Sequence, residues 1–248
     1  MQFAAENIWI IGAGSDIGEA TARYLSQEGA NIILSAQLAD RISNLSHSLA
    51  GNNLAVPMDI TDFSNLPGKI DLIYKSYPHL DRVFFFPTHY EASLIIDMKE
   101  SNIDQSFLIN VQALMHLSIH LLPKLRLQEA RSQFNICASL AGLGGLKCAQ
   151  PYSATKAALI NFAESLKLEE DKVEVKLINP GFVKGPLTSK NDFNLPFMIS
   201  PDKAAKYILK GVQGRGFEID FPQKMSWLLK FMRLLPYWLY FKIARLLA

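Results

Sequence analysis

The chain has 248 residues, an apolar share of 49% and a formal net charge of +2. This length suits one α/β domain with a sizeable core, and the composition excludes a disordered chain. A charge this small gives no argument for a nucleic-acid partner. The two cysteines, Cys137 and Cys148, offer neither a disulfide framework nor a zinc-ligand spacing. Since the chain enters a strand by Ile8, it leaves no room for a signal peptide, and we expect a cytoplasmic protein without a metal site.

The first predicted unit is a strand at residues 7–11, a glycine-rich turn, and a helix whose apolar pattern runs from Ile17 to Leu25. This order places backbone N–H groups and the positive end of a helix against a phosphate. We therefore expect a dinucleotide to contact Gly12, Gly14, Ser15, Asp16, Ile17 and Gly18. The alternative is that the glycines only make a tight connection between strand and helix.

Further short apolar runs predict strands at residues 31–35, 54–58 and 82–86, followed by a long helix over about 102–128. Asn110 lies within the apolar pattern of that helix. An Asn inside a helix costs stability relative to Ala, which favours a specific partner for its side chain or a helix boundary at this point. His116 and His120 are four residues apart, but no third ligand accompanies them, so we do not expect a metal there.

The stretch from Ser139 to Lys156 predicts a site for proton transfer. Ser139 follows a strand at residues 134–138, and Pro151 opens a helix that carries Tyr152 and Lys156 on one face. A tyrosine with its ordinary pKa of about 10 is a poor base at neutral pH, and a nearby cation favours the phenolate. Ser139 can add a hydroxyl to the oxygen that gains or loses charge. The alternative is an ordinary amphipathic helix, where such Tyr–Lys pairs are common.

Strands at residues 173–178 and 216–221, with a helix starting near Ser200, complete the predicted order. Strands and helices alternate throughout, which predicts an α/β fold with one doubly wound parallel sheet between two helix layers. We expect residues 1–221 to form this domain and residues 222–248 a C-terminal amphipathic extension of it.

The set Ser139, Tyr152 and Lys156, in this order of elements, resembles the short-chain dehydrogenase/reductase family over residues 7–221. The resemblance implies a Rossmann fold and NAD(P)-dependent hydride transfer between nicotinamide and an alcohol/carbonyl substrate. It implies that Tyr152 is the general acid/base, that Lys156 lowers its pKa and binds the nicotinamide ribose, and that Ser139 orients the substrate. Asn110 would open its helix and hold a water linked to Lys156. Relatives are commonly homodimers or homotetramers.

The same resemblance implies further cofactor contacts. Gln37 lies just past the second strand, where relatives select NAD with an Asp or NADP with an Arg. This chain has no carboxylate there and Arg41 one helical turn on, which favours NADP over NAD. In the segment that begins Asp59-Ile60, the carboxylate would hold the adenine edge, or it would serve as a helix cap. Pro180 and Val183 belong to a Pro-Gly-x-Val segment whose backbone contacts the nicotinamide amide.

Three stretches depart from the family pattern. Ile11 and Asp16 replace a Thr and the middle Gly of the phosphate turn, where Asp16 can cap the helix or repel a pyrophosphate. Phe85 and Phe86 stand in place of an Asn pair. Gly185 replaces a Thr that Thr188 can substitute. These departures keep a second interpretation open, a non-catalytic dinucleotide-binding sensor or scaffold.

The last segment, residues 222–248, combines five basic residues with many aromatic ones and contains no acidic residue. Pro236 should divide it into two helices, the first with Ser226, Lys230 and Arg233 as a basic stripe. Three interpretations stay open: peripheral contact with the inner face of a membrane, a contact between subunits, or a flap over the substrate mouth. The apolar residues of segment 186–200, among them Phe193 and Phe197, predict a lid over a bulky or lipophilic substrate.

Overall fold

The computed structural model describes residues 2–190 and 197–247. Within them lies a seven-stranded parallel sheet in the order β3-β2-β1-β4-β5-β6-β7. Its strands are β1 (Asn7–Ile11), β2 (Asn31–Ser35), β3 (Leu54–Ala55), β4 (Arg82–Phe85), β5 (Ser132–Cys137), β6 (Val173–Pro180) and β7 (Glu218–Phe221). The order reverses direction at β1, so the predicted doubly wound α/β fold is confirmed.

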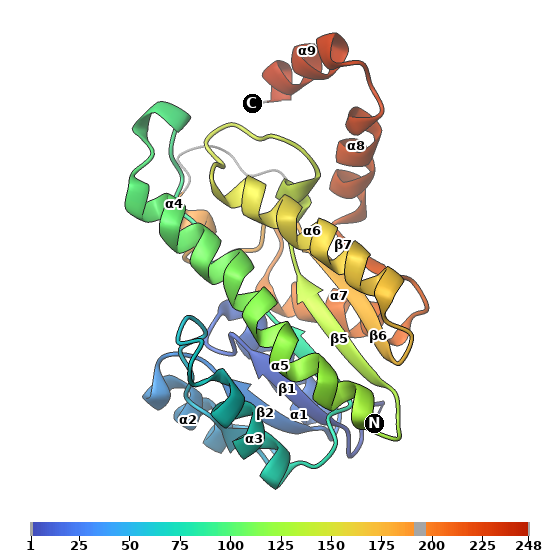
Figure 1. Ribbon diagram of the computed structural model, residues 1–248. Helices are drawn as coiled ribbons and strands as arrows, with labels where there is room; N and C mark the ends of the chain where they lie inside the picture. The colour runs from blue at the N-terminus through green and yellow to red at the C-terminus, as the bar shows by residue number, and fades with distance from the viewer. Residues whose placement is uncertain (1, 191–196, 248) are drawn as a thin grey trace.

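Helices cover both faces of the sheet (Figure 1). One face packs against α3 (Leu66–Ser76), α5 (Ala113–Leu127) and α6 (Tyr152–Glu169). The other packs against α1 (Asp16–Gln27), α2 (Ala39–Ser48) and α7 (Pro201–Gln213). After β7 the chain continues into α8 (Gln223–Arg233) and α9 (Tyr237–Leu247). The predicted break at Pro236 is confirmed, since it separates the last two helices.

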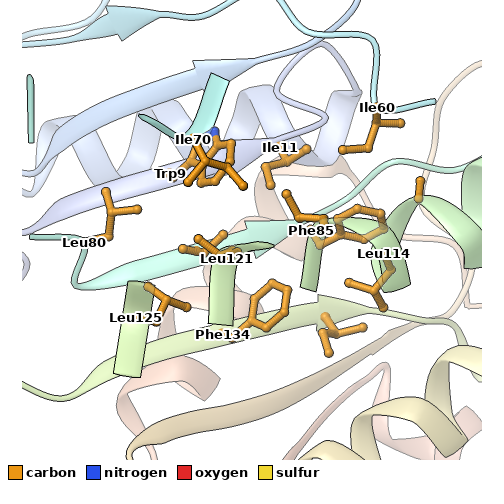
Figure 2. Packing of buried hydrophobic residues seen from close by; sticks show 14 of the residues in the cluster. Trp9, Ile11, Ile60, Ile70, Leu80, Phe85, Leu114, Leu121, Leu125 and Phe134 are labelled. Carbon is orange, nitrogen blue, oxygen red and sulfur yellow. The ribbon is translucent and has the colours of Figure 1, made fainter. Parts of the chain in front are cut away.

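The core is divided by the sheet because successive side chains of a strand point to opposite faces. Trp9 and Ile11 of β1 belong to the layer under α5, whereas Ile8 and Ile10 belong to the layer under α1. Figure 2 shows the first layer, where Trp9, Phe85 and Phe134 come from three neighbouring strands. Both layers are closed to solvent, which fixes the register of the central strands and the positions of the loops at their ends.

The predicted strand at 54–58 is wrong in extent, since β3 contains only Leu54 and Ala55. The chain still follows β2, because Val56 N donates to Leu34 O at 2.8 Å and Met58 N to Ala36 O at 3.0 Å. Pro57 lies between these donors and has no N–H, so the regular ladder stops.

The predicted single helix over 102–128 is three segments: α4 (Glu100–Phe107), a π-helical turn (Leu108–Gln112) and α5. Asn110 lies in the π-turn, and such turns are frequent at functional sites. The span Glu100–Leu127 is long and apolar enough to cross a membrane by composition alone. Because Leu114, Leu117 and Leu121 of α5 are fully buried under the sheet, we interpret it as a core helix.

Candidate active site

A cavity of about 1690 Å³ opens at the carboxyl ends of the strands, where ligands bind in doubly wound sheets. It exceeds the roughly 300–1,000 Å³ of a site for one small molecule, so it has room for a cofactor and a substrate. Its lining includes most of the predicted site residues: Gly12, Gly14, Ser15, Asp16, Ile17, Gln37, Asp59, Ile60, Ser139, Tyr152, Lys156, Pro180 and Val183. Two predicted residues, Gly18 and Asn110, do not line it.

The glycine turn forms the end of the cavity next to α1. Gly12 has a φ of +82°, and a Cβ there would lie 2.9 Å from the backbone N of Pro87, so only glycine fits. Ser15 caps α1, because its Oγ accepts a hydrogen bond from Gly18 N at 3.1 Å. The prediction that Asp16 caps the helix is therefore wrong; Asp16 is the first helical residue. Gly18 has a structural role, since a Cβ there would overlap Gly12 O.

Asp16 lies against Gly185, so two departures from the family pattern meet in space. A Cβ on Gly185 would overlap Asp16 Oδ2, which means that the carboxylate fills the room of a side chain at position 185. Thr188 turns back into this corner, with its Oγ1 2.9 Å from Val183 O and 3.0 Å from Gly185 N. The structure thus places a carboxylate at the N-terminus of α1, where a phosphate would otherwise bind.

Asp16→Asn should tighten NADPH binding about tenfold at low ionic strength, because it removes a negative charge facing the phosphate site. The gain should shrink in high salt, which screens such charges. Fluorescence titration of both proteins measures it. Asp40→Asn is the matched control, since Asp40 is exposed and does not line the cavity. Unchanged or weaker binding by Asp16→Asn would show that the carboxylate does not oppose the cofactor.

The residues expected at the adenosine line the cavity close to the glycine turn. Gln37 Nε2 donates to Asp59 Oδ2 at 3.0 Å, so the two predicted contacts form one pair. Asp59 Oδ1 accepts from Thr61 N at 2.9 Å and stabilises a turn; it caps no helix, since α3 begins only at Leu66. Arg41 also lines the cavity, and its Nη2 lies 3.5 Å from Glu19 Oε2 in a partly exposed, weak ion pair.

Tyr152 and Lys156 lie together on the first turns of α6. Lys156 Nζ is 5.5 Å from the Tyr152 ring centroid and donates to Cys137 O at 3.1 Å. Burial raises the pKa of Tyr152, and a hydrogen bond with Ser139 only partly offsets this increase. Burial also lowers the pKa of Lys156 to about 8. The net shift of the Tyr152 pKa is therefore opposite to the expected one, because desolvation exceeds the favourable contacts.

Ser139 is held beside Tyr152 by a short 3₁₀ turn, Leu140–Leu143. Its Oγ donates to Pro180 O at 3.2 Å and accepts from Ala141 N at 3.1 Å. The turn is fastened to α6, since Ser153 Oγ donates to Ala141 O at 2.6 Å. Gly142 packs so closely that a Cβ would lie 2.7 Å from the Lys156 carbonyl carbon. These contacts fix the distance between the serine hydroxyl and the phenol.

Asn110 does not line the cavity, and its side chain bonds to segments behind the cavity wall. Its Oδ1 accepts from His89 N at 2.6 Å, while its Nδ2 donates to His89 O at 3.0 Å and to Thr155 Oγ1 at 2.9 Å. Because both amide hydrogens are used, the side chain braces the segment after β4 against α6. Phe85 and Phe86 are buried in opposite core layers. In this structure Asn110 holds the segment after β4 close to α6.

Sequence reasoning missed the contribution of residues 87–90. The Tyr90 ring stands edge-on to Tyr152, with 4.9 Å between centroids and 67° between planes. Thr88 Oγ1 is buried, and Thr88 lines the cavity, yet this oxygen has no hydrogen-bond partner in the described part of the chain. A buried hydroxyl is normally paired. In the sequence, the one sign of a functional role for residues 87–90 is that they directly follow the carboxyl end of a predicted strand.

Two other expectations concern metals and the lid. Within residues 2–190 and 197–247, no group of three His, Cys, Asp or Glu residues could hold a metal ion. His116 instead stacks on Phe63 with 3.9 Å between ring centroids.

The predicted lid is described only at its ends, where Leu187 and Phe197 line the cavity. Residues 191–196, which include Phe193, lie outside the described residues.

Comparison with known proteins decides the family. The family profile described as short chain dehydrogenase matches residues 6–194. The chain belongs to the short-chain dehydrogenase family. An oxidoreductase of Staphylococcus epidermidis, described as uncharacterised, is 32% identical over 186 residues, which cover 74% of this chain and 80% of the relative. A similar oxidoreductase of Staphylococcus aureus is 30% identical over 203 residues, 81% of this chain and 87% of its own length.

Solved structures of short-chain dehydrogenases share the fold of this one. An enzyme of Burkholderia phymatum in complex with NAD superposes with a TM-score of 0.84 at 16% identity, covering 93% of each chain. An alcohol dehydrogenase of the archaeon Thermococcus sibiricus complexed with 5-hydroxy-NADP gives a TM-score of 0.80 at 17% identity, over 88% of this chain and 96% of that one. At these identities the likeness concerns the fold alone.

Proposed function

We propose that this short-chain dehydrogenase is an NAD(P)-dependent oxidoreductase that interconverts an alcohol and a carbonyl compound. The observation that carries the proposal is the placement of Ser139, Tyr152 and Lys156 in one wall of a cavity whose far end is the glycine turn before α1. A scaffold that only bound a dinucleotide would have no need for this set of side chains. The family and its relatives described as oxidoreductases support the reaction class.

The residues present fit a nicotinamide dinucleotide. The cradle at Gly12 leaves no room for a Cβ, the α1 N-terminus faces the cavity, and Thr88 Oγ1 offers a buried hydroxyl without a partner among the described residues. Gly14, Ser15 and Ile17 would hold the pyrophosphate, with Gln37, Asp59 and Ile60 around the adenosine. Pro180, Val183, Tyr152 and Lys156, which line the cavity, would surround the nicotinamide. The charge of Asp16 opposes this fit.

The bound nicotinamide would supply or accept the hydride. In carbonyl reduction, Ser139 and Tyr152 bind the substrate oxygen, and Tyr152 gives its phenolic proton to that oxygen. Its raised pKa suits this task, because the phenol stays protonated at neutral pH. Lys156 carries its charge below about pH 8 and stabilises the phenolate that forms. Alcohol oxidation needs the phenolate at the start, so its rate should increase as the pH rises.

For the cofactor, we propose a preference for NADP that depends on Arg41. Its guanidinium lies beside Gly14, where it can pair with a 2′-phosphate. Arg41→Ala should weaken NADPH binding about tenfold and leave NADH binding within about twofold. Fluorescence titration with both dinucleotides measures this, with Arg23→Ala, an exposed arginine outside the cavity wall, as control. An equal loss of affinity for NADPH and NADH would show that Arg41 does not select the 2′-phosphate.

For the substrate, we propose a bulky or lipophilic alcohol or ketone. Support comes from the apolar wall that α8 and α9 add to the cavity, including Leu228, Met232 and Phe241. NADPH oxidation assayed against a panel of lipophilic ketones tests the proposed function. Sustained turnover is expected. NADPH binding without turnover of any carbonyl compound would instead support the rival function, a dinucleotide-binding sensor or scaffold.

We further propose a cytoplasmic homodimer or homotetramer. Apolar side chains that remain exposed on α4 and α5, among them Ile103, Met115 and Ile119, offer a face on which a second copy can pack. The π-turn between these two helices contains the buried Asn110, so association would also support the segment that Asn110 braces. Light scattering of the purified chain reports the oligomeric state, and a monomer at micromolar concentration would contradict the proposal.

A further inference from the structure

Helices α8 and α9 follow one another around a bend at Pro236, and this α8–α9 segment has two apolar faces. Figure 1 shows it projecting at the end of the molecule where β5 and β6 end. Its inner face lines the cavity with Met225, Leu228, Leu229, Met232, Tyr240 and Phe241. Tyr240 also donates its hydroxyl to Gly145 O at 3.1 Å, which ties α9 to the loop before α6. The inner face therefore lies where a flap over the substrate cavity was expected. This position does not explain the apolar residues on the other face.

The outer face consists of large apolar side chains that water surrounds. Trp227 and Phe231 of α8 recur at the spacing of one helix face with Leu234, which directly follows this helix, and the three are 73%, 59% and 83% exposed. On α9, Tyr237 and Trp238 are 68% and 72% exposed. Contiguous apolar patches of this kind mark interaction surfaces in soluble proteins.

Bonds to β7 hold this face outward. Lys230 Nζ lies 2.6 Å from Glu218 Oε2 and 2.7 Å from Asp220 Oδ2, and Ser226 Oγ donates to Asp220 Oδ2 at 2.5 Å. The expected basic stripe is thus wrong for two of its three members, because Ser226 and Lys230 face acidic residues of the sheet edge. Lys224 and Lys242 are exposed and do not line the cavity, whereas Arg245 lines it and Arg233 lies beside Gly144.

The charges favour a lipid surface over a second copy of the chain. In a symmetric contact the same patch meets itself, so cations would face cations with no acidic residue in 222–248 to pair with them. An anionic bilayer offers the opposite charge to Lys224 and Lys242. It also accepts Trp and Tyr at the level of its headgroups and aliphatic groups below them.

We propose that the outer face of the α8–α9 segment docks on an anionic bilayer, such as the inner leaflet that faces the cytoplasm. The inner face of the same segment then forms a path for a membrane-dissolved alcohol or ketone toward Tyr152. This second step rests on the proposed oxidoreductase function, whereas docking does not. The two faces belong to helices only 11 residues long each, so the cavity mouth lies next to the lipid.

Co-sedimentation of the full chain with vesicles tests the docking step. Vesicles of phosphatidylcholine with phosphatidylglycerol should bind the protein, and vesicles of phosphatidylcholine alone should bind it at least tenfold more weakly. The triple variant Trp227→Ala/Phe231→Ala/Trp238→Ala should lose at least tenfold in binding to the anionic vesicles. Leu127→Ala/Leu168→Ala is the control, since these exposed leucines lie on α5 and α6, and it should bind as the unmodified chain does.

Turnover separates docking from catalysis. None of the three substituted aromatic residues lines the cavity, so the triple variant should keep its activity on a water-soluble ketone and lose it on a ketone dissolved in the vesicles. Equal sedimentation of the unmodified chain and the triple variant would overturn the proposal. So would a change in self-association, measured by sedimentation velocity, without a change in vesicle binding, because the face would then contact a second copy. Vesicle binding without any turnover would support docking and contradict only the proposed function.

Discussion

Replacing Tyr152 with Phe should lower kcat for carbonyl reduction by about 10²–10⁴, the usual contribution of a positioned general acid. The ring and its edge-on contact with Tyr90 remain, so the phenolic proton is the main loss. NADPH binding should stay within about threefold of the unmodified chain, since one hydroxyl contributes little to holding a dinucleotide. Steady-state kinetics with the best ketone of the panel, together with NADPH titration, measures both quantities.

Tyr90→Phe is the matched control for this experiment. It removes a phenolic oxygen from the neighbouring ring of the same aromatic pair and leaves Tyr152 intact. Its effect on kcat should be less than about tenfold, because Tyr152 alone gives the proton in the proposed mechanism. If Tyr152→Phe retained most of its turnover, or if Tyr90→Phe lost more of its kcat than Tyr152→Phe, Tyr152 would not be the general acid.

Replacing Lys156 with Met should abolish most activity and yet stabilise the fold. The pKa of Lys156 falls from 10.5 to about 8 because its side chain is only 2% exposed, which corresponds to a cost of roughly 3 kcal/mol for the charged form. Met fills a similar volume without that charge, although Cys137 O loses its donor. At pH 7 we expect the free energy of unfolding to rise by about 1–2 kcal/mol and kcat to fall at least tenfold.

The stability gained by Lys156→Met should depend on pH. Since the pKa is lower in the folded protein, the unfolded chain binds more protons between about pH 8 and 10.5, and stability rises with pH over that window. The gain from Lys156→Met should therefore be fully present below pH 8 and disappear toward pH 10.5. Urea unfolding of both proteins at pH 7 and pH 10 measures it. A variant that is less stable than the unmodified chain at pH 7 would contradict the burial of a costly charge.

The sheet was predictable because its strands are apolar runs between clear helix patterns. The exceptions have local causes: Pro57 ends the β3 ladder, and the π-turn around Asn110 leaves no periodic signal that a short window can detect. Ser15 and Asp16 both suit a helix cap, and only the backbone conformation shows that Ser15 takes that position.

The site was predictable where residues lie close in sequence and hidden where they meet only in space. Ser139, Tyr152 and Lys156 share one strand–loop–helix unit, so their spacing carried the signal. The contact of Asp16 with Gly185 joins loops that follow β1 and β6. The lowered pKa of Lys156 and the raised pKa of Tyr152 follow from burial, which a sequence does not express.

The central claim, that Tyr152 and its neighbours serve hydride transfer to a carbonyl, is tested most directly by a single turnover with labelled cofactor. NADPH deuterated at the transferred position of its nicotinamide is bound to the protein and mixed with a lipophilic ketone, and the product alcohol is examined by mass spectrometry. We predict deuterium on the alcohol carbon with the unmodified chain, and a loss of about 10²–10⁴ in the rate of that step with Tyr152→Phe. Bound cofactor that transfers no deuterium to any ketone, or the same rate in both proteins, would contradict it.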